Sequence, residues 1–426
     1  MVRFIGSLVV GFLVVATASA QAPPQPLPPS ITGTPLPAPI VPAAGIATTT
    51  APIARFANLN AYPPETVAAI YSLRAGSDWL WRMNQSNGRF FPGLLPAVRM
   101  PLDSDLDVRQ AYATLALAEA ARFTGDERYA ARATQAALAL LTLTRLDPAD
   151  ATCRVPALAA DKGNSVPFAA LLCLALLELP NADAKLLADA EALGVYLRKR
   201  IQPSGAILMS DEPTSADSDA DAMGSGLALR ALVATHKLKP DAAKKDAILR
   251  AIGYSANQFK ARKSPQLAAA MIPAVADVYL NMGKDPALAA LAFEMADTLC
   301  GCQYSRADAR SVAWVGGFKL SSPEPGLDSL QATSALAMAA KLTRQVPDLT
   351  RFVRYRQAAN DGLAFARSLQ FSDENAEHFE KAYRVRFLVG GAHLSPSDGT
   401  VRIDATGQLV SAQLAFLQSG AESRSD

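Results

Sequence analysis

Apolar residues recur at helical spacing from about Pro64 to Gly420, and the polar stretches between them alternate between short and long. Six of the apolar segments are rich in alanine and leucine and have almost no polar face. A helix that is apolar on all sides is buried on all sides, so these segments are predicted to form an inner layer. They lie near residues 106–124, 165–179, 222–236, 265–281, 328–343 and 405–418.

Six partner segments carry Lys, Arg, Asp and Glu along one stripe, which is typical of amphipathic helices that face water on one side. They lie near residues 65–84, 126–145, 183–201, 241–261, 285–302 and 350–369. Short turns such as Lys239-Pro-Asp241 follow the inner segments, and longer polar stretches fill most of the other gaps. If the helices run up and down in turn, the long loops emerge at one end, where functional residues normally lie.

This alternation predicts an all-α fold, an (α/α)6 toroid of six helical hairpins with a buried inner ring and long loops on one face. A period of roughly 60 residues is consistent with such a repeat. The loops repeat as well, because a glycine that permits a tight reversal is followed by an apolar residue that packs back. The repeated motifs are Gln85-Ser-Asn-Gly88-Arg-Phe90, Gln202-Pro-Ser-Gly205-Ala-Ile207, Gly316-Gly-Phe318 and Gly390-Gly-Ala-His393.

These motifs, with the stretch from Val315 to Leu336, resemble the toroid repeat of the prenyltransferase and squalene-cyclase superfamily and of six-hairpin glycosidases. The resemblance implies the fold of the helical part and matches no specific enzyme family. Related toroids serve as glycoside hydrolases, polysaccharide lyases and sugar epimerases, so the fold does not choose an activity. The sequence Asp217-Ser-Asp219-Ala-Asp221 lacks the adjacent Asp pair that squalene-type cyclases use, and the Asp, Cys and His zinc site of protein prenyltransferases is absent.

The N-terminus has the features of a secretory signal: Arg3, an apolar run from Phe4 to Ala16, and the cleavage motif Ala18-Ser19-Ala20. A retained anchor is the alternative. The following residues are uncharged and rich in proline, which favours an extended spacer. We therefore expect a secreted or periplasmic protein without a stable membrane span after cleavage, with tethering to a surface as an open alternative. The predicted organisation is signal peptide 1–20, Pro-rich disordered linker 21–62, one toroid domain 63–420 and disordered tail 421–426.

The composition excludes one class of partner. Lys and Arg number 41 against 39 Asp and Glu, and no basic run occurs, which argues against nucleic-acid binding. An exported chain can oxidise its cysteines. Cys300 and Cys302 are too close to pair comfortably, Cys153 with Cys302 is the pairing considered, and Cys173 lies on an apolar face that favours packing. The pairing of the four cysteines stays open.

Two acidic clusters are the strongest local signal for chemistry: Asp103-Ser-Asp105-Leu-Asp107 before the first inner segment and Asp217-Ser-Asp219-Ala-Asp221 before the third. Single Asp residues also precede the fifth and sixth. Helix capping explains one Asp per helix, and capping with solubility is the favoured interpretation. Three carboxylates within five residues exceed that need and suit acid–base chemistry. The catalytic candidates in these clusters are Asp105, Asp107, Asp219 and Asp221.

No metal site and no cofactor are predicted. The Asp-x-Asp-x-Asp pattern leaves Ca²⁺ binding open, although the Gly and Glu positions of an EF-hand are missing. Arg109 begins an otherwise apolar segment, so pairing with Asp105 or Asp404 is expected, and gripping a substrate carboxylate is the functional alternative. Arg402 and Asp404 alternate with apolar residues and are expected to form a pair where the last hairpin meets the first. They are the other half of a candidate substrate site.

Three more side chains complete the candidate site. His393 in the last long stretch is a candidate general base, although an exposed histidine without a role is more common. Trp314 and Phe318 are candidates for stacking on sugar rings, and rim packing is the alternative.

Three functions are consistent with these sequence patterns. The first is an exported carbohydrate-active enzyme, a hydrolase or lyase acting on a polysaccharide through acidic rim residues. The second is a non-catalytic toroid that binds a polysaccharide, a peptide or another surface partner. The third, least favoured, is a terpenoid-cyclase-like enzyme. The choice between enzyme and binder stays open at this point, as do the substrate and the oligomeric state.

Overall fold

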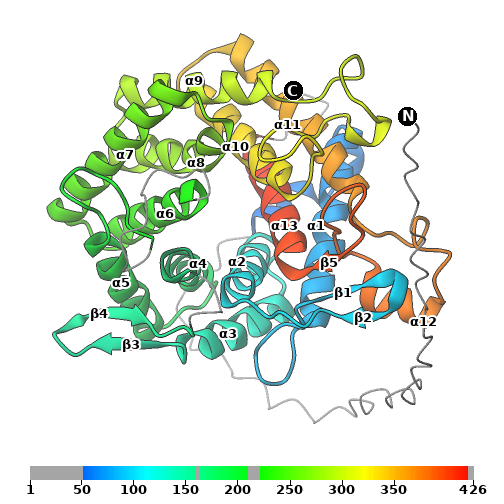
Figure 1. Cartoon of the computed structure of the whole chain (residues 1–426), viewed down its shortest axis with the longest axis horizontal. Helices are drawn as coiled ribbons and strands as arrows, with labels where there is room; N and C mark the ends of the chain where they lie inside the picture. Colours follow the sequence, from blue (N-terminus) through cyan, green and yellow to red (C-terminus); the bar gives the residue numbers. More distant parts are fainter. Residues whose placement is uncertain (1–50, 160–163, 210–220, 421–426) are drawn as a thin grey trace, which may run out of the picture. The chain divides into compact units, whose positions relative to one another are not determined.

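Long helices alternate between an inner and an outer ring in the computed structural model, which describes residues 51–159, 164–209 and 221–420 (Figure 1). The inner helices contact one another in chain order, and the last one closes the ring by packing against the first. They are α2 (Asp107–Thr124), α4 (Ser165–Glu178), α6 (Ala222–Leu238), α8 (Pro265–Met282), α10 (Leu327–Thr343) and α13 (Ile403–Gln418).

The outer helices each pack against the inner helices of their own and the neighbouring hairpin. They are α1 (Pro64–Met83), α3 (Glu127–Leu141), α5 (Ala184–Lys199), α7 (Ala242–Arg262), α9 (Pro286–Gly301) and α11 (Leu349–Ser368). The predicted (α/α)6 toroid is therefore confirmed, with the sixth hairpin formed by α13 and α1 from the two ends of the ring.

Burial follows the sequence pattern closely. Every side chain of α4 from Phe168 to Cys173 is fully buried, as expected for a helix without a polar face. In the outer helix α3, by contrast, the buried positions Tyr129, Ala133, Ala137 and Leu140 recur at helical spacing and leave the opposite face to water. The inner ring is thus packed on both sides, and the outer ring on one.

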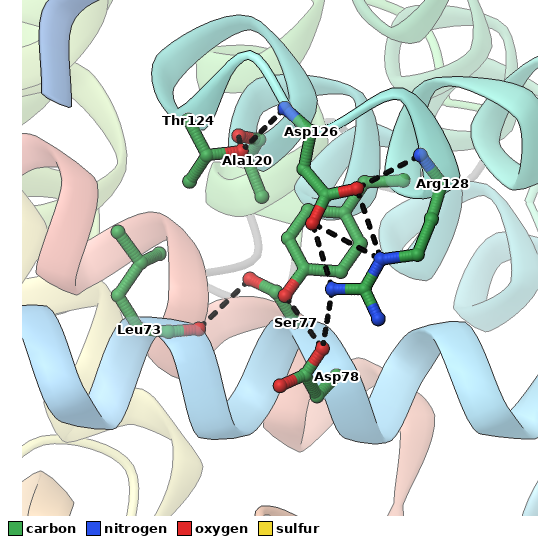
Figure 2. Close-up of polar contacts among 8 residues, drawn as sticks. Leu73, Ser77, Asp78, Ala120, Thr124, Asp126 and Arg128 are labelled. Atoms are coloured by element: carbon green, nitrogen blue, oxygen red, sulfur yellow. Dashed lines mark hydrogen bonds and ion pairs between the residues drawn. The ribbon is translucent and has the colours of Figure 1, made fainter. Parts of the chain in front are cut away.

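Aspartates in the short turns begin the outer helices. Figure 2 shows the turn between α2 and α3, where the Asp126 carboxylate accepts a hydrogen bond from the backbone N–H of Arg128 at 2.8 Å. The Tyr129 hydroxyl and the Arg128 guanidinium of the same turn reach Asp78 on α1. Such caps satisfy amide groups that have no partner within the helix. The same arrangement recurs at Asp183, Asp241, Asp285 and Asp348, which begin α5, α7, α9 and α11.

The repeated glycines hold the long-loop end of the outer ring together. Gly205 has a φ of +94° and lies so close to α7 that an added Cβ would be 2.4 Å from the carbonyl oxygen of Arg250. Gly390 has the same φ, and its Cβ would be 2.2 Å from the carbonyl oxygen of Ala75 on α1. In each case the loop that leaves one outer helix packs on the next. The corresponding glycines of the other two motifs are Gly88 and Gly316.

Short strands modify the all-helical prediction. β1 (Gly93–Leu95) pairs with β2 (Met100–Pro101) and with β5 (Val401–Arg402), so the first and last long loops share a small antiparallel sheet. The helix expected to run to residue 145 ends at Leu141, because the Thr-rich stretch after it forms β3 (Thr144–Asp147), which pairs with β4 (Asp150–Pro156). The link between α7 and α8 is short, although it lies at the long-loop end. Shorter helical turns are η1 (Pro52–Phe56), η2 (Leu59–Ala61), η3 (Pro96–Val98), η5 (Val312–Trp314), α12 (Lys381–Tyr383) and η6 (Arg384–Leu388).

Several predictions fall outside the described residues, namely the signal peptide, most of the linker, the C-terminal tail and Asp219. All four cysteines are free thiols, so the Cys153–Cys302 pairing is wrong. Cys153 lies in β4, which packs on α5, whereas Cys302 follows α9 in another hairpin. Within the described ranges, no helix combines the length and the hydrophobicity that crossing a bilayer requires.

Candidate functional site

The first acidic cluster is organised by an arginine that the sequence reading did not single out. Arg89 donates through Nε to the Asp105 carboxylate at 2.9 Å and through Nη2 to the Asp107 carboxylate at 2.7 Å. Burial alone would lower the pKa of Arg89, but its hydrogen bonds with Asp107 and Asp105 outweigh that cost and raise it. Gln110 fixes the other side of Asp105 at 2.7 Å.

Capping does not explain the aspartates that precede the inner helices. No side chain caps α2, α6, α10 or α13, although Asp107, Asp221, Asp328 and Asp404 lie at or next to their first residues. The expected capping hydrogen bond is therefore missing at these residues, whereas Asp107, Asp328 and Asp404 do place a negative charge in the first turn of their helices, as the same interpretation expects. The capping aspartates lie in the short turns at the other end of the ring. Carboxylates thus gather at the long-loop end for ion pairing or for binding.

Arg109 is half-buried and has no carboxylate within ion-pair distance among the described residues. Its Nη1 donates to the Ser104 hydroxyl at 3.2 Å. Burial and the neighbouring charge of Arg402 lower the pKa of Arg109, while Asp404 and Asp105 act in the opposite direction. The expected pair with Asp105 or Asp404 does not form, although both carboxylates lie near enough to act on the guanidinium.

Arg402 and Asp404 form the predicted pair at the junction of the first and last hairpins. The guanidinium donates twice to the carboxylate, at 2.9 and 2.5 Å, and the two side chains keep only 18% and 10% of their surface. Arg402 belongs to β5, which pairs with β1 of the first long loop. The ion pair itself lies within one segment, and the pairing of β5 with β1 joins the last long loop to the first.

His393 lies in the same last loop and is half-buried. Its Nδ1 lies 2.8 Å from the Ser395 carbonyl oxygen, and its ring packs on Phe371 at 5.5 Å. A proton on Nδ1 satisfies that carbonyl and leaves Nε2 as an acceptor, the arrangement that a general base needs.

The two candidate aromatic residues differ in exposure. Trp314 is half-buried and packs against Tyr304, with ring centroids 5.4 Å apart. Phe318 keeps only 1% of its surface and belongs to the core, so its ring presents no face to a ligand. The apolar residue after the repeated glycine packs inward, as its motif predicts.

The second acidic cluster is only partly described. Asp221 is the residue before α6, whereas Asp219 lies outside the described residues. Across the described ranges, no three His, Cys, Asp or Glu side chains converge as metal ligands. In the first cluster, the carboxylates of Asp105 and Asp107 instead accept hydrogen bonds from the Arg89 guanidinium.

A cavity lined by both polar and apolar side chains, the axial cavity, lies between the inner helices, one turn below Arg109 on α2 and Asp404 on α13. It offers about 40 Å³ to the centres of water molecules, which is space for roughly three waters at about 10–15 Å³ each. Five of the six inner helices line it. Its polar lining consists of Tyr112, Arg230, Gln331, Ser334, Gln408 and Ser411.

Charged residues at the base of this cavity were not predicted from the sequence. Ser411 donates to the Glu119 carboxylate at 2.7 Å, and Arg230 lies 3.6 Å from Asp277. Burial raises the pKa of Glu119 to about 7, with Arg230 opposing and Glu178 reinforcing the shift. The available signal was a single charge in the middle of an alanine-rich inner helix, because such a charge must find a partner.

Glu119 makes the stability of the fold depend on pH. Its folded pKa of about 7 exceeds its ordinary value of 4.5, so the folded chain holds a proton that the unfolded chain loses between those values. This stabilisation is complete below pH 4.5 and is lost as pH rises through 7. One pKa unit corresponds to about 1.4 kcal/mol, so the loss is on the order of 3 kcal/mol.

Glu119→Gln is therefore expected to flatten the fall in melting temperature between pH 5 and pH 8, as followed by circular dichroism. Gln retains an acceptor for Ser411 and does not titrate. Glu374→Gln, at an exposed position, is the matched control and should keep the wild-type slope. Parallel pH profiles for wild type and Glu119→Gln would show that Glu119 does not titrate in this range.

No protein-family model matches the chain, and no curated protein matches its sequence. Solved structures do match. An unsaturated glucuronyl hydrolase specific for heparin is similar with a TM-score of 0.58 and 14% identity, covering 82% of this chain and 97% of that chain. The α-1,6-mannanase GH76A from a Salegentibacter species gives 0.58 and 12%, covering 82% and 99%. The cellobiose 2-epimerase from Bacillus thermoamylovorans gives 0.59 and 12%, covering 83% and 98%.

The likeness is one of fold. These proteins share the six-hairpin toroid with the chain at identities too low to carry over any site residue. An inactive variant of the mannanase has been solved with α-1,6-mannotetrose, with a TM-score of 0.57 and 13% identity to this chain.

Proposed function

We propose that this chain is a carbohydrate-active enzyme, a hydrolase or a lyase, that works outside the cytoplasm on a polysaccharide bound at the long-loop end of the ring. One observation carries the proposal: Asp105 and Arg402 from the first and last long loops gather with Arg109 and Asp404, from the first turns of α2 and α13, above the axial cavity. The fold supports it, because structurally similar toroids are carbohydrate-active enzymes.

The roles follow from the contacts. Arg109 has room for a ligand carboxylate, so a uronic-acid unit fits the site better than a neutral sugar. Asp105 and Asp107 accept hydrogen bonds from Arg89, which suits a base or an acceptor of sugar hydroxyls better than a proton donor. Nε2 of His393 is a second candidate base.

The proton donor must come from another segment. Glu119, the half-buried carboxyl with the raised pKa, follows Asp107 by about 18 Å along α2, at 1.5 Å per residue. Paired carboxylates of glycosidases lie only about 5–10 Å apart, so these two cannot act as one pair. Asp219 and Asp221, which precede α6, are our candidates for the acid.

The test is incubation of the purified chain with neutral and uronic-acid polysaccharides, following reducing ends and the absorbance of unsaturated products together. Reducing ends alone would indicate hydrolysis, and both signals together a lyase. We expect product from a uronic-acid polymer. If no polysaccharide yields either signal, the enzymatic proposal is wrong.

A non-catalytic sugar-binding toroid is the second candidate. The ion pairs of Asp105 and Asp107 with Arg89 favour it, because they give these carboxylates a structural role. It predicts saturable binding without product. The cyclase alternative finds no support, since the described axial cavity offers only about 40 Å³ to water centres, whereas such chemistry needs a deep cavity.

A further inference from the structure

The loop between α9 and α10 presents an aromatic side chain on a rigid base. Two backbone hydrogen bonds join its ends, from Tyr304 N to the Gly317 carbonyl oxygen at 2.8 Å and from Gly316 N to the Tyr304 carbonyl oxygen at 2.9 Å. A surface loop with joined ends is held compactly by its own side chains. Tyr304 is almost fully buried and supports Trp314, which stays partly exposed. The indole is therefore displayed from a fixed support.

The same loop carries two arginines that form no ion pair within the described part of the chain. Lys319 pairs with Asp308 at 2.5 Å, so these two charges cancel. Arg306 and Arg310 are exposed, and neither has an ion-pair partner among the described residues. The segment 303–320 thus carries two exposed positive charges and one partly exposed aromatic side chain, residue types that suit a sugar ring bearing a carboxylate.

An open pocket adjoins this aromatic support. The Tyr304 hydroxyl donates to the Pro323 carbonyl oxygen at 2.7 Å, next to the pocket wall at Ser322 and Glu324. The pocket offers about 220 Å³ to water centres, which is space for more than ten waters by the same measure as the axial cavity. Hydroxyl groups and the carboxylates of Glu324 and Asp328 line it. These groups accept hydrogen bonds from sugar hydroxyls and repel a uronate, so the hydroxyl edge of a sugar ring suits the pocket. It can therefore admit a sugar ring, which the axial cavity cannot.

The pocket also belongs to the candidate site at the entrance of the axial cavity. Glu324 accepts hydrogen bonds from Ser395 at 2.9 Å and from the Ser397 hydroxyl at 2.6 Å, which fixes the last long loop against the α9–α10 loop. Arg402 lies further along that last loop. On the other side, the pocket is lined by Asp328, three residues before Gln331 of the axial cavity. One turn of α10 therefore separates this pocket from the axial cavity.

We propose that the α9–α10 loop is a subsite for an acidic polysaccharide, with Trp314 stacking on one sugar ring, Arg306 and Arg310 pairing with uronate groups, and the adjoining pocket taking the next sugar. This inference rests on the proposed function, because it extends the binding site from the entrance of the axial cavity along the polysaccharide chain. It requires a polymer or an oligosaccharide of several units rather than a single sugar.

Equilibrium titration of the full chain with an oligogalacturonate and with a neutral manno-oligosaccharide of equal length tests the subsite. Tryptophan fluorescence is the readout. The chain has three tryptophans; Trp79 is fully buried, and Trp81 is half-buried on α1. We expect a saturable fluorescence change with the uronate that weakens as salt rises.

Trp314→Ala should abolish the fluorescence change and weaken uronate binding about tenfold, as measured by calorimetry. Arg306→Ala with Arg310→Ala should weaken uronate binding by about tenfold and leave neutral binding within twofold. Arg145→Ala, an exposed arginine of β3, is the matched control and should bind as wild type.

Unchanged uronate affinity in these variants, together with product formation by the wild type, would overturn the subsite and leave the proposed function standing. Binding that depends on Trp314 without any product would support the subsite and remove the enzymatic claim. No binding to either oligosaccharide, or sedimentation with phosphatidylglycerol vesicles instead, would overturn the subsite in favour of another occupant.

Discussion

Replacing Gly390 by alanine is expected to lower the free energy of unfolding by about 3 kcal/mol or more, a large effect for one methyl group. The φ of +94° is costly for any residue with a Cβ, and that Cβ would be 2.2 Å from the carbonyl oxygen of Ala75. Relief requires the last long loop to move away from α1. Chemical unfolding at constant pH measures the change.

Gly253→Ala is the matched control. Gly253 lies within α7, and an added Cβ would meet nothing within 4 Å. Alanine favours the helix over glycine by up to about 1 kcal/mol, so this variant should be slightly more stable than wild type. If Gly390→Ala unfolds at the wild-type denaturant concentration, the repeated glycines do not set the spacing between loop and outer helix.

The double substitution Asp105→Asn with Asp107→Asn should lower the turnover of the polysaccharide by at least about 100-fold. The Asn side chains keep the size of the site but remove the negative charges that face Arg89 and the ligand. The free energy of unfolding should fall as well, by on the order of 1–3 kcal/mol, because Arg89 keeps only 26% of its side-chain surface and loses two ion pairs. The rate of product formation and the free energy of unfolding are measured on the same preparation.

Asp103→Asn separates local chemistry from general charge. Asp103 belongs to the same cluster but is exposed. Its replacement changes the net charge without touching the Arg89 contacts, so turnover should stay within about twofold of wild type. Full activity in the double variant at a temperature where it remains folded would remove these two carboxylates from the mechanism.

The helices could be predicted because their signals are local. Helical periodicity, the alanine-rich inner segments and the short Asp-containing turns each depend on neighbours in sequence, and the inner and outer assignments hold throughout the described ring. The repeated glycine motifs were recognised for the same reason. Their partners on the next outer helix could not be read, since Gly390 and Ala75 are far apart in the chain.

The site was less predictable because its contacts join distant segments. Whether Asp107 caps a helix or pairs with Arg89 depends on how the first long loop folds, and the sequence offered the capping interpretation first. Arg402 and Asp404 were found because they are close in sequence. Glu119 was overlooked as one polar residue in an apolar segment, and its meaning appears only when α13 places Ser411 beside it.

Hydrogen–deuterium exchange of the full chain, with and without a uronic-acid oligosaccharide, locates the binding site most directly. We expect slower exchange in the long loops at 84–106 and 369–402, and in the loop that carries Trp314. The short turns at the opposite end of the ring should exchange at their unliganded rates. Protection confined to those short turns, or none at saturating oligosaccharide, would contradict a carbohydrate site at the long-loop end.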